Sequence, residues 1–204
     1  MKPICFLTFL ILAISNYSYS AAFFFQPLFY HDTPLSLSPR EPSKSIAGKG
    51  VKSVKQLTAF FLQKNPNCDK TRIQRLAQLY ITEARIEGIN SDVAFVQMCL
   101  ETGFLTFRGL TKPEMHNYCG LGSIDAHRPG EWFPDEQMGV RAHIQHLQAY
   151  GTTDRLKQEL VDPRYHYVNP RGQVFNIYQL GGTWTADKEY GFKLARLLYD
   201  LAQV

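Results

Sequence analysis

The chain has 204 residues, of which 45% are hydrophobic, and its formal net charge at pH 7 is +4. This length suits one globular domain with an additional segment, and the hydrophobic fraction is sufficient for a buried core. The positive charge is too small for a dedicated nucleic-acid-binding protein, so we expect no nucleic-acid partner.

Residues 1–21 have the pattern of a secretory signal peptide. Lys2 precedes an apolar run from Ile4 to Ile14, and small residues follow around Ser20 and Ala21. The run is shorter than the roughly 20 apolar residues that span a bilayer. We therefore expect a secreted or periplasmic protein of the cell envelope. The alternative is an uncleaved membrane anchor, because phenylalanines at 23–25 prolong the apolar run.

Residues 22–50 are predicted to form a flexible linker. This stretch contains four prolines and two glycines among serines and lysines, and it shows no helical or strand periodicity. The folded domain is then expected over residues 51–204.

The first half of this domain predicts three helices. One begins at Ser53 and ends near Asn65, and a second, longer helix runs from Asp69 to Gly88, with apolar residues at helical spacing. A third follows Ser91 and stops at Gly103; it is apolar nearly all round, which is typical of a helix buried on most sides.

Residues 103–134 are rich in Gly, Pro and aromatics and predict loops or short strands. A fourth helix is expected around Val140 to Leu147, a short fifth between Asp154 and Asp162, and a last one from Tyr190 to Leu201. The expected fold class is α+β, predominantly helical, with an irregular or β lobe between the third and fourth helices.

Glu101 is the leading catalytic candidate. It lies at the end of the apolar third helix, where burial and the negative end of the helix dipole both disfavour a charged carboxylate. A raised pKa is what a general acid needs near neutral pH. The alternative is a solvated glutamate on one exposed edge of the helix.

Four segments in chain order resemble the glucosaminidase domain of glycoside hydrolase family 73. They are residues 100–104 (Leu-Glu-Thr-Gly-Phe), 117–122 (Asn-Tyr-Cys-Gly-Leu-Gly), the helix that follows Phe133, and residues 180–187 (Leu-Gly-Gly-Thr-Trp-Thr-Ala-Asp) with Tyr190 shortly after. The resemblance covers most of the chain after residue 53. It implies a lysozyme-like fold and an endo-β-N-acetylglucosaminidase that cleaves peptidoglycan glycan strands after N-acetylglucosamine, with Glu101 as the acid and no cofactor.

A glycan needs aromatic platforms beside hydrogen-bonding side chains. We expect Phe104, Tyr118 and Trp184 to provide platforms. Gln97, one helical turn before Glu101, and Asn117 are expected to provide hydrogen bonds. Core packing is the alternative for the aromatics, except that the resemblance places Tyr118 and Tyr190 in the site.

The second catalytic group is left open by the sequence. Relatives carry a second carboxylate after the Asn-aromatic motif, but here that stretch is short and offers Asp125 and Glu131, with Asp135 and Glu136 just after. Either Asp125 acts as base or stabiliser, or the substrate's own 2-acetamido oxygen attacks and Tyr190 positions it. The shortness of the loop favours the second mechanism.

Rival interpretations were a metal or thiol enzyme, a non-catalytic glycan-binding protein and a lytic transglycosylase. His143 and His146 are three residues apart, but the pair lacks the Glu of the zincin motif, and we expect no metal site. Cys68, Cys99 and Cys119 are an odd number, so they cannot all pair within one chain. A Cys99–Cys119 disulfide and three buried thiols both remain open.

Overall fold

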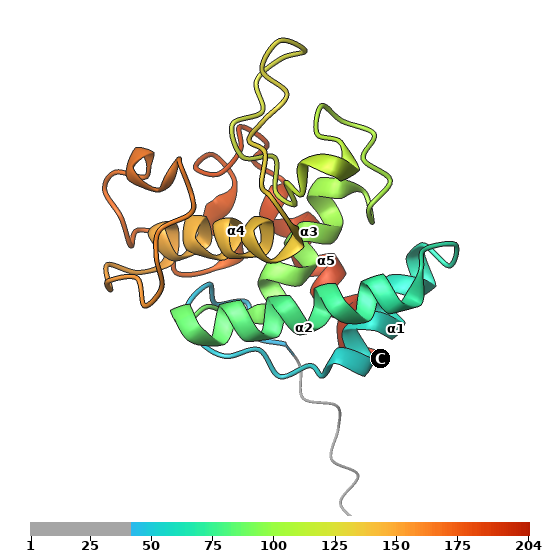
Figure 1. Cartoon of the computed structure of the whole chain (residues 1–204). Coiled ribbons are helices and arrows are strands. Elements are labelled where there is room, and N and C mark those ends of the chain that lie inside the picture. The colour runs from blue at the N-terminus through green and yellow to red at the C-terminus, as the bar shows by residue number, and fades with distance from the viewer. Residues whose placement is uncertain (1–41) are drawn as a thin grey trace, which may run out of the picture. The chain divides into compact units, whose positions relative to one another are not determined.

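The computed structural model describes residues 42–204, and the predicted signal peptide and residues 22–41 of the predicted linker lie outside this part. The described elements are α1 (Val54–Lys64), α2 (Lys70–Glu87), α3 (Ser91–Thr102), η1 (Pro113–Met115), α4 (Glu136–Gly151), η2 (Tyr165–Tyr167), η3 (Ile177–Leu180) and α5 (Tyr190–Ala202), where η denotes a short 3₁₀ helix (Figure 1).

The long helices begin and end close to the predicted residues. Ser53 caps α1 in a reciprocal capping box with Gln56, and Asp69 caps α2, which ends at Gly88 in the left-handed conformation. The cap of α3 is Asn90, whose side chain accepts from the Asp92 backbone, whereas the sequence pattern had indicated Ser91. Local side-chain chemistry therefore sets these boundaries.

The core forms around α3, which crosses behind α2 and α4 in Figure 1. Helix α2 packs against α1, α3 and α4, and α5 packs against α3 on the other side. Val93 through Cys99 are all fully buried, as the apolar sequence of this helix predicted. Among residues 42–204, no helix combines the length and the apolar character needed to cross a bilayer.

The predicted linker ends earlier than residue 50. Ile46 is fully buried in the main core, and its backbone N–H donates to the carbonyl of Phe175 at 3.0 Å. The Ile46 carbonyl in turn accepts from Asn90, and Ala47 forms a bridge with Ile89. The prediction was wrong for residues 42–50 because one apolar residue and its backbone dock against segments that are distant in sequence.

The predicted fifth helix, between Asp154 and Asp162, was also wrong, because this stretch is irregular. The backbone N–H groups of Lys157 and Gln158 donate to the carboxylate of Glu87 on α2, at 2.8 and 3.1 Å. Those of Val161 and Asp162 donate to the side chain of Gln145 on α4. The backbone N–H groups that would form hydrogen bonds within a helix donate instead to side chains of α2 and α4.

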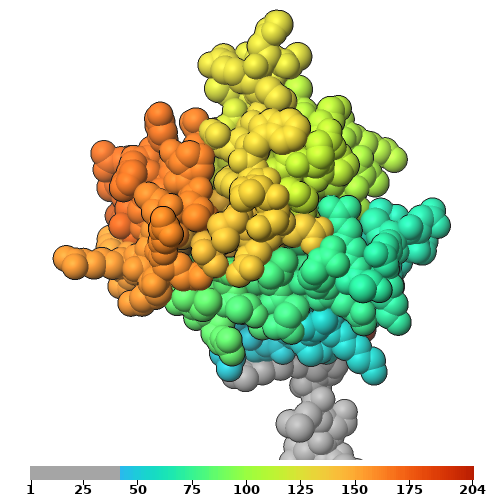
Figure 2. Space-filling view, in the orientation of Figure 1, coloured from blue at the N-terminus to red at the C-terminus, as the bar shows by residue number. Residues whose placement is uncertain are grey.

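The β contribution within the described residues consists of isolated bridges. The loop between residues 119 and 134, drawn in yellow, projects from the helical body (Figures 1 and 2), and its base is fixed against α4. A Cβ added at Gly139 would lie 1.8 Å from the His116 carbonyl oxygen, so only glycine allows this approach. The structure is thus predominantly helical with an irregular lobe.

Candidate active site

Glu101 lies in the last turn of α3, directly before Gly103 turns the chain in the left-handed conformation. Phe104, Leu105 and Phe107 follow with positive φ angles of 54°, 61° and 47°, which are uncommon for residues that carry a Cβ. This run of residues with positive φ turns the chain away from the helix axis immediately after α3 ends. The carboxylate is therefore left at the open end of a buried helix.

One oxygen of the Glu101 carboxylate is held by two donors. The indole Nε1 of Trp184 donates to Glu101 Oε1 at 3.0 Å, and the Tyr190 hydroxyl donates to the same oxygen. The other oxygen, Oε2, faces Gly120, where an added Cβ would lie 3.9 Å from it. Two donors thus fix the orientation of the carboxylate and leave Oε2 for the proton.

Burial raises the pKa of Glu101, and the hydrogen bonds from Tyr190 and Trp184 oppose this rise without cancelling it. The position at the C-terminal end of α3 adds a helix-dipole effect in the same direction as burial. The expected raised pKa is therefore confirmed, and the protonated form persists to higher pH than in an exposed glutamate.

A chain of buried hydrogen bonds continues behind Tyr190. Gln97 Nε2 donates to the Tyr190 hydroxyl at 3.0 Å, Gln97 Oε1 lies 3.0 Å from His143 Nε2, and His143 Nδ1 lies 2.8 Å from the Tyr80 hydroxyl. We call Tyr80, His143, Gln97 and Tyr190 the relay. Its members come from α2, α4, α3 and α5, so four helices meet at the polar atoms behind Glu101.

The donors of the relay all point the same way. Because Gln97 uses its amide N–H on Tyr190, its carbonyl oxygen must accept, and His143 therefore carries its proton on Nε2 and accepts from Tyr80 at Nδ1. Burial lowers the pKa of His143 to about 3, so the ring is neutral near pH 7. The relay ends in the Tyr190 O–H bond directed at Glu101.

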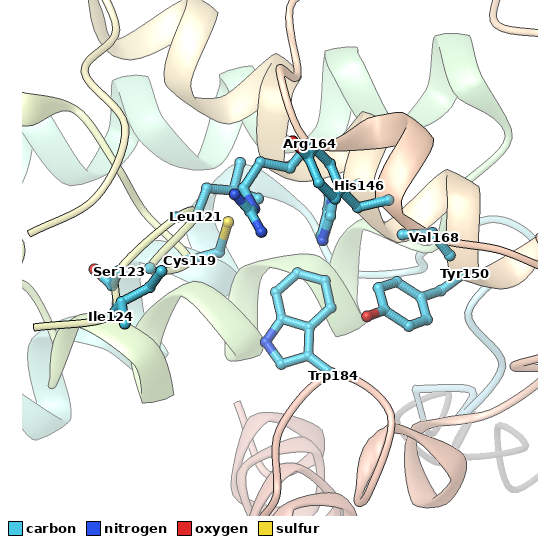
Figure 3. A pocket seen from close by; sticks show the side chains of 12 residues that line it. Cys119, Leu121, Ser123, Ile124, His146, Tyr150, Arg164, Val168 and Trp184 are labelled. Carbon is cyan, nitrogen blue, oxygen red and sulfur yellow. The ribbon is translucent and has the colours of Figure 1, made fainter. Parts of the chain in front are cut away.

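A pocket of about 250 Å³ lies beside this carboxylate. Figure 3 looks into it, with the ring of Trp184 at its base, Cys119, Leu121, Ser123 and Ile124 on one side and Tyr150 and Val168 on the other. The nitrogen atoms of His146 and Arg164 point into the space over Trp184. Gly120 also lines the pocket, which connects it to the Glu101 oxygen described above.

The structure brings together part of the predicted site. Glu101, Gln97, Trp184 and Tyr190 are joined by direct hydrogen bonds, although Gln97 is fully buried and touches Tyr190 rather than the pocket. Tyr190 is predicted to position an acetamido group, and in this structure its hydroxyl donates to Glu101. These residues are therefore neighbours in one constellation.

Asn117 and Tyr118 lie inside the protein. The Asn117 amide donates to the carbonyls of Leu121 and Glu131, and its oxygen accepts from the Leu121 backbone, so all its polar atoms serve the loop. Tyr118 is fully buried in the main core, and burial raises the pKa of its hydroxyl. Direct sugar contact, which the sequence had suggested, does not fit either residue because neither reaches the surface.

Phe104 and Asp125 also lie apart from the pocket. Phe104 packs on Phe60 and Phe61, with ring centroids 5.8 and 5.4 Å away, and it lines a separate hollow near α5. Asp125 sits in the projecting loop, where its carboxylate accepts from Arg128 Nη2 at 3.1 Å and from backbone N–H groups of the same turn. Phe104 thus serves the core, and Asp125 stabilises its own turn.

The other acidic candidates have structural partners or positions. Asp135 caps α4, and Glu136 forms ion pairs with Arg72 and Arg75. The Glu131 side chain lies against Gly122, where an added Cβ would be 2.8 Å from its Oε1. Because Gly122 lines the pocket, Glu131 is the acidic side chain of this loop that packs against the pocket wall.

The cysteines and histidines that suggested a thiol or metal enzyme are not arranged for either chemistry. Cys68, Cys99 and Cys119 are free thiols, and burial raises the pKa of each. His143 belongs to the relay, and His146 Nδ1 lies 2.7 Å from Asp162 Oδ2. No group of three or more metal-ligating side chains occurs in the described stretch from residue 42 onward.

Sequence reasoning missed Tyr80, His146, Asp162 and Arg164 as neighbours of the site, and it had considered His143 only as a packing or metal-binding residue. Helical periodicity places Tyr80 on a buried stripe, but it does not say what its hydroxyl meets. The remaining residues come from α4 and the irregular segment, and nothing in their spacing joins them.

Comparison with known proteins identifies the family of this chain. Residues 77–203 match the family model described as glucosaminidase, mannosyl-glycoprotein endo-beta-N-acetylglucosaminidase. An uncharacterized protein of Borreliella burgdorferi is 39% identical over 158 residues, which is 78% of this chain and 77% of that protein.

The fold is similar to that of Staphylococcus aureus autolysin E, whose crystal structure was solved in complex with the muropeptide NAM-L-Ala-D-iGlu. The TM-score is 0.51 at 14% identity, and the match covers 80% of this chain and 72% of that one. This likeness confirms the predominantly helical, lysozyme-like fold class. Since the family model spans more than half of the chain and includes Glu101, the protein belongs to the glucosaminidase family and is a glycoside hydrolase of the endo-β-N-acetylglucosaminidase type.

Proposed function

We propose that the protein cleaves the glycan strands of peptidoglycan after N-acetylglucosamine, with Glu101 as the general acid. The observation that carries the proposal is the Glu101 carboxylate itself. Its Oε1 is held by Trp184 and Tyr190, its pKa is raised by burial, and its Oε2 faces Gly120, which lines the pocket. The muropeptide bound by autolysin E supports peptidoglycan as the substrate.

In this mechanism, Glu101 transfers its proton to the glycosidic oxygen as the bond to the anomeric carbon breaks. The 2-acetamido oxygen of the substrate bonds to the anomeric carbon and forms an oxazolinium ring. Water then opens this ring, and the Glu101 carboxylate takes up the proton that water loses. The route needs no second carboxylate, which fits an Asp125 that is engaged in its own turn.

The test replaces Glu101 by Gln, which keeps the shape of the side chain but carries no transferable acidic proton. We expect the rate of strand cleavage to fall by about 10²–10⁴-fold while the melting temperature stays near that of the wild type. Trp184→Phe is a useful companion, because it removes the indole donor and keeps an aromatic ring at this position. A folded Glu101→Gln variant with a near wild-type rate would overturn the assignment.

Mass spectrometry of the released fragments identifies the bond that is cut. We expect N-acetylglucosamine at the new reducing end. An anhydro-muramic product would instead indicate a lytic transglycosylase, and binding without any fragment would indicate a non-catalytic glycan-binding protein. The anomer formed first is expected to be β, as substrate assistance retains configuration.

Export is a further part of the proposal and rests on the sequence of residues 1–21. The substrate lies outside the cytoplasm, so the enzyme must reach the envelope. N-terminal sequencing of envelope protein should begin near residue 21. An intact Met1 on that material would favour a membrane anchor.

A further inference from the structure

The pocket beside Glu101 contains an arginine without a carboxylate partner. Arg164 lies partly buried, with its guanidinium carbon 4.5 Å from the centroid of the Tyr167 ring. Its backbone N–H donates to Asp162 Oδ1 at 2.8 Å, which anchors the residue at the edge of the pocket. Within residues 42–204 the guanidinium forms no ion pair.

Other partly buried arginines of the domain form ion pairs or hydrogen bonds within the protein. Arg141 pairs with Glu83 at 3.0 Å, and Arg72 pairs with Glu136 at 2.8 Å. Arg171 donates to the Gln148 side chain and to backbone carbonyls. Arg164 differs because Tyr167 supports its flat face while its N–H groups point into the pocket (Figure 3). This leaves a planar donor set free for a ligand.

His146 presents a second polar group on the same side of the pocket. Its Nδ1 is bound at 2.7 Å by Oδ2 of Asp162, whose side chain is fully buried. The carboxylate holds the proton on Nδ1 and orients the opposite edge, and the ring packs on Trp184 at 5.1 Å between centroids. The Nε2 edge is therefore available to a ligand.

The twelve residues that line the pocket include His146 and Arg164 but no Asp or Glu, and the carboxylates of Glu101 and Glu131 lie outside this lining. A guanidinium whose two parallel N–H groups have no partner in the protein is well suited to bind a carboxylate. Serine, tyrosine and tryptophan side chains around it suit a sugar ring that carries such a group.

We propose that Arg164 binds a carboxylate carried by the muramic acid residue of the strand, with His146 beside it in the pocket. This inference rests on the proposed function, since muramic acid is what distinguishes peptidoglycan from a polymer of N-acetylglucosamine alone. The carboxylate has two sources. It is the free lactyl group of strands stripped of peptide, or an acidic group of the peptide stem in intact material.

The experiment compares kcat/KM on four substrates: peptide-stripped strands, the same strands with their carboxylates converted to methylamides, intact peptidoglycan, and its methylamidated form. We expect the wild-type enzyme to prefer one charged substrate over its amidated counterpart by about 10-fold or more, as a charge-assisted bidentate contact implies. A preference confined to the stripped pair identifies the lactyl group, and one confined to the intact pair identifies the stem.

Arg164→Gln should abolish that preference, and Arg164→Lys should restore only part of it because it keeps charge without the fork. Arg155→Gln is the matched control, since it removes the same charge from an exposed position on the same irregular segment and should leave the preference unchanged. Melting temperatures of all variants separate binding from folding.

Equal kcat/KM of the wild-type enzyme on charged and amidated substrates would overturn the carboxylate assignment while leaving strand cleavage intact. Arg164→Gln that keeps the preference would also overturn it. If the wild-type enzyme cleaves none of the four substrates, the proposed function itself fails, so the two failures are distinguishable.

Discussion

The two sides of Glu101 are built in different ways. Behind the carboxylate, four helices bring the relay together, and every polar atom in it has a partner within the protein. In front of it, loops, the residues around η2 and one face of α4 form the pocket, where Arg164 and the Nε2 edge of His146 have no hydrogen-bond or ion-pair partner in the described part of the chain. Helices thus orient the Glu101 carboxylate, and the residues around η2 together with α4 present the groups that remain free for substrate.

This contrast has an energetic reason. A buried polar group without a partner costs about 1–3 kcal/mol, so the relay is stable only when it is complete. The pocket is open to solvent, and water satisfies its donors until a ligand replaces that water. We therefore expect substitutions behind Glu101 to change stability and pH dependence, and substitutions in front of it to change substrate preference.

Among substitutions around Glu101, the largest effect is expected from Tyr190→Phe, which removes the hydroxyl that donates to Glu101. Loss of a hydrogen bond to a charged group should lower kcat/KM by about 10–100-fold. Because this hydrogen bond lowers the Glu101 pKa, its removal should raise that pKa further and move the alkaline limb of the pH profile of kcat/KM upward. A reduced rate with an unshifted alkaline limb would contradict this role.

His143→Gln tests the middle of the relay. We expect a loss of about 1–3 kcal/mol in the free energy of unfolding near pH 7, because a flexible glutamine amide does not hold its oxygen and nitrogen at the fixed positions of the two ring nitrogens that meet Tyr80 and Gln97. His127→Gln, on the exposed loop, is the control.

The same variant should alter acid sensitivity. The His143 pKa is about 3 in the folded protein against an ordinary 6.5, so the unfolded chain takes up its proton first as the pH falls. The stabilisation by neutral His143 is complete above pH 6.5 and is lost progressively between 6.5 and 3. Urea unfolding at several pH values in this window should therefore show a flatter decline for His143→Gln than for the wild type, and parallel declines would contradict it.

Glu87→Ala addresses the irregular segment that carries the pocket. Its carboxylate holds the backbone N–H groups of Lys157 and Gln158, so we expect a loss of about 1–3 kcal/mol and faster proteolysis between residues 152 and 161. Glu114→Ala removes an exposed carboxylate and is the control. Unchanged proteolysis would mean that other contacts hold this segment.

The smallest effect is expected from Asp125→Asn. Its carboxylate is engaged by its own turn and 46% exposed, so kcat/KM should stay within about twofold of the wild type. Glu131→Gln in parallel tests the carboxylate that packs against the pocket wall. A collapse of activity in Asp125→Asn alone would return the second catalytic role to that residue.

Much of the helical framework was predictable because its signals are local. Ser53, Asp69, Gly88 and Gly103 act on the nearest turn of backbone, and the structure confirms the boundaries that they predict. The raised pKa of Glu101 was predictable for the same reason: the apolar neighbours in the same helix bury the carboxylate, and the C-terminal end of that helix places the negative end of its dipole there. Asn117 and Tyr118 were assigned to the sugar because a motif gives positions without saying which way the side chains point.

The sequence by itself determined the five long helices, the family resemblance and a candidate acid, Glu101, at the end of the third. The tertiary structure decided what the Glu101 carboxylate touches. The relay joins Tyr80, Gln97, His143 and Tyr190 from four helices. The irregular segment between Asp154 and Asp162 is not helical, because Glu87 and Gln145 accept hydrogen bonds from its backbone. Caps and periodicity act over a few residues, whereas these contacts join residues up to 93 positions apart, so only the packed fold can select them.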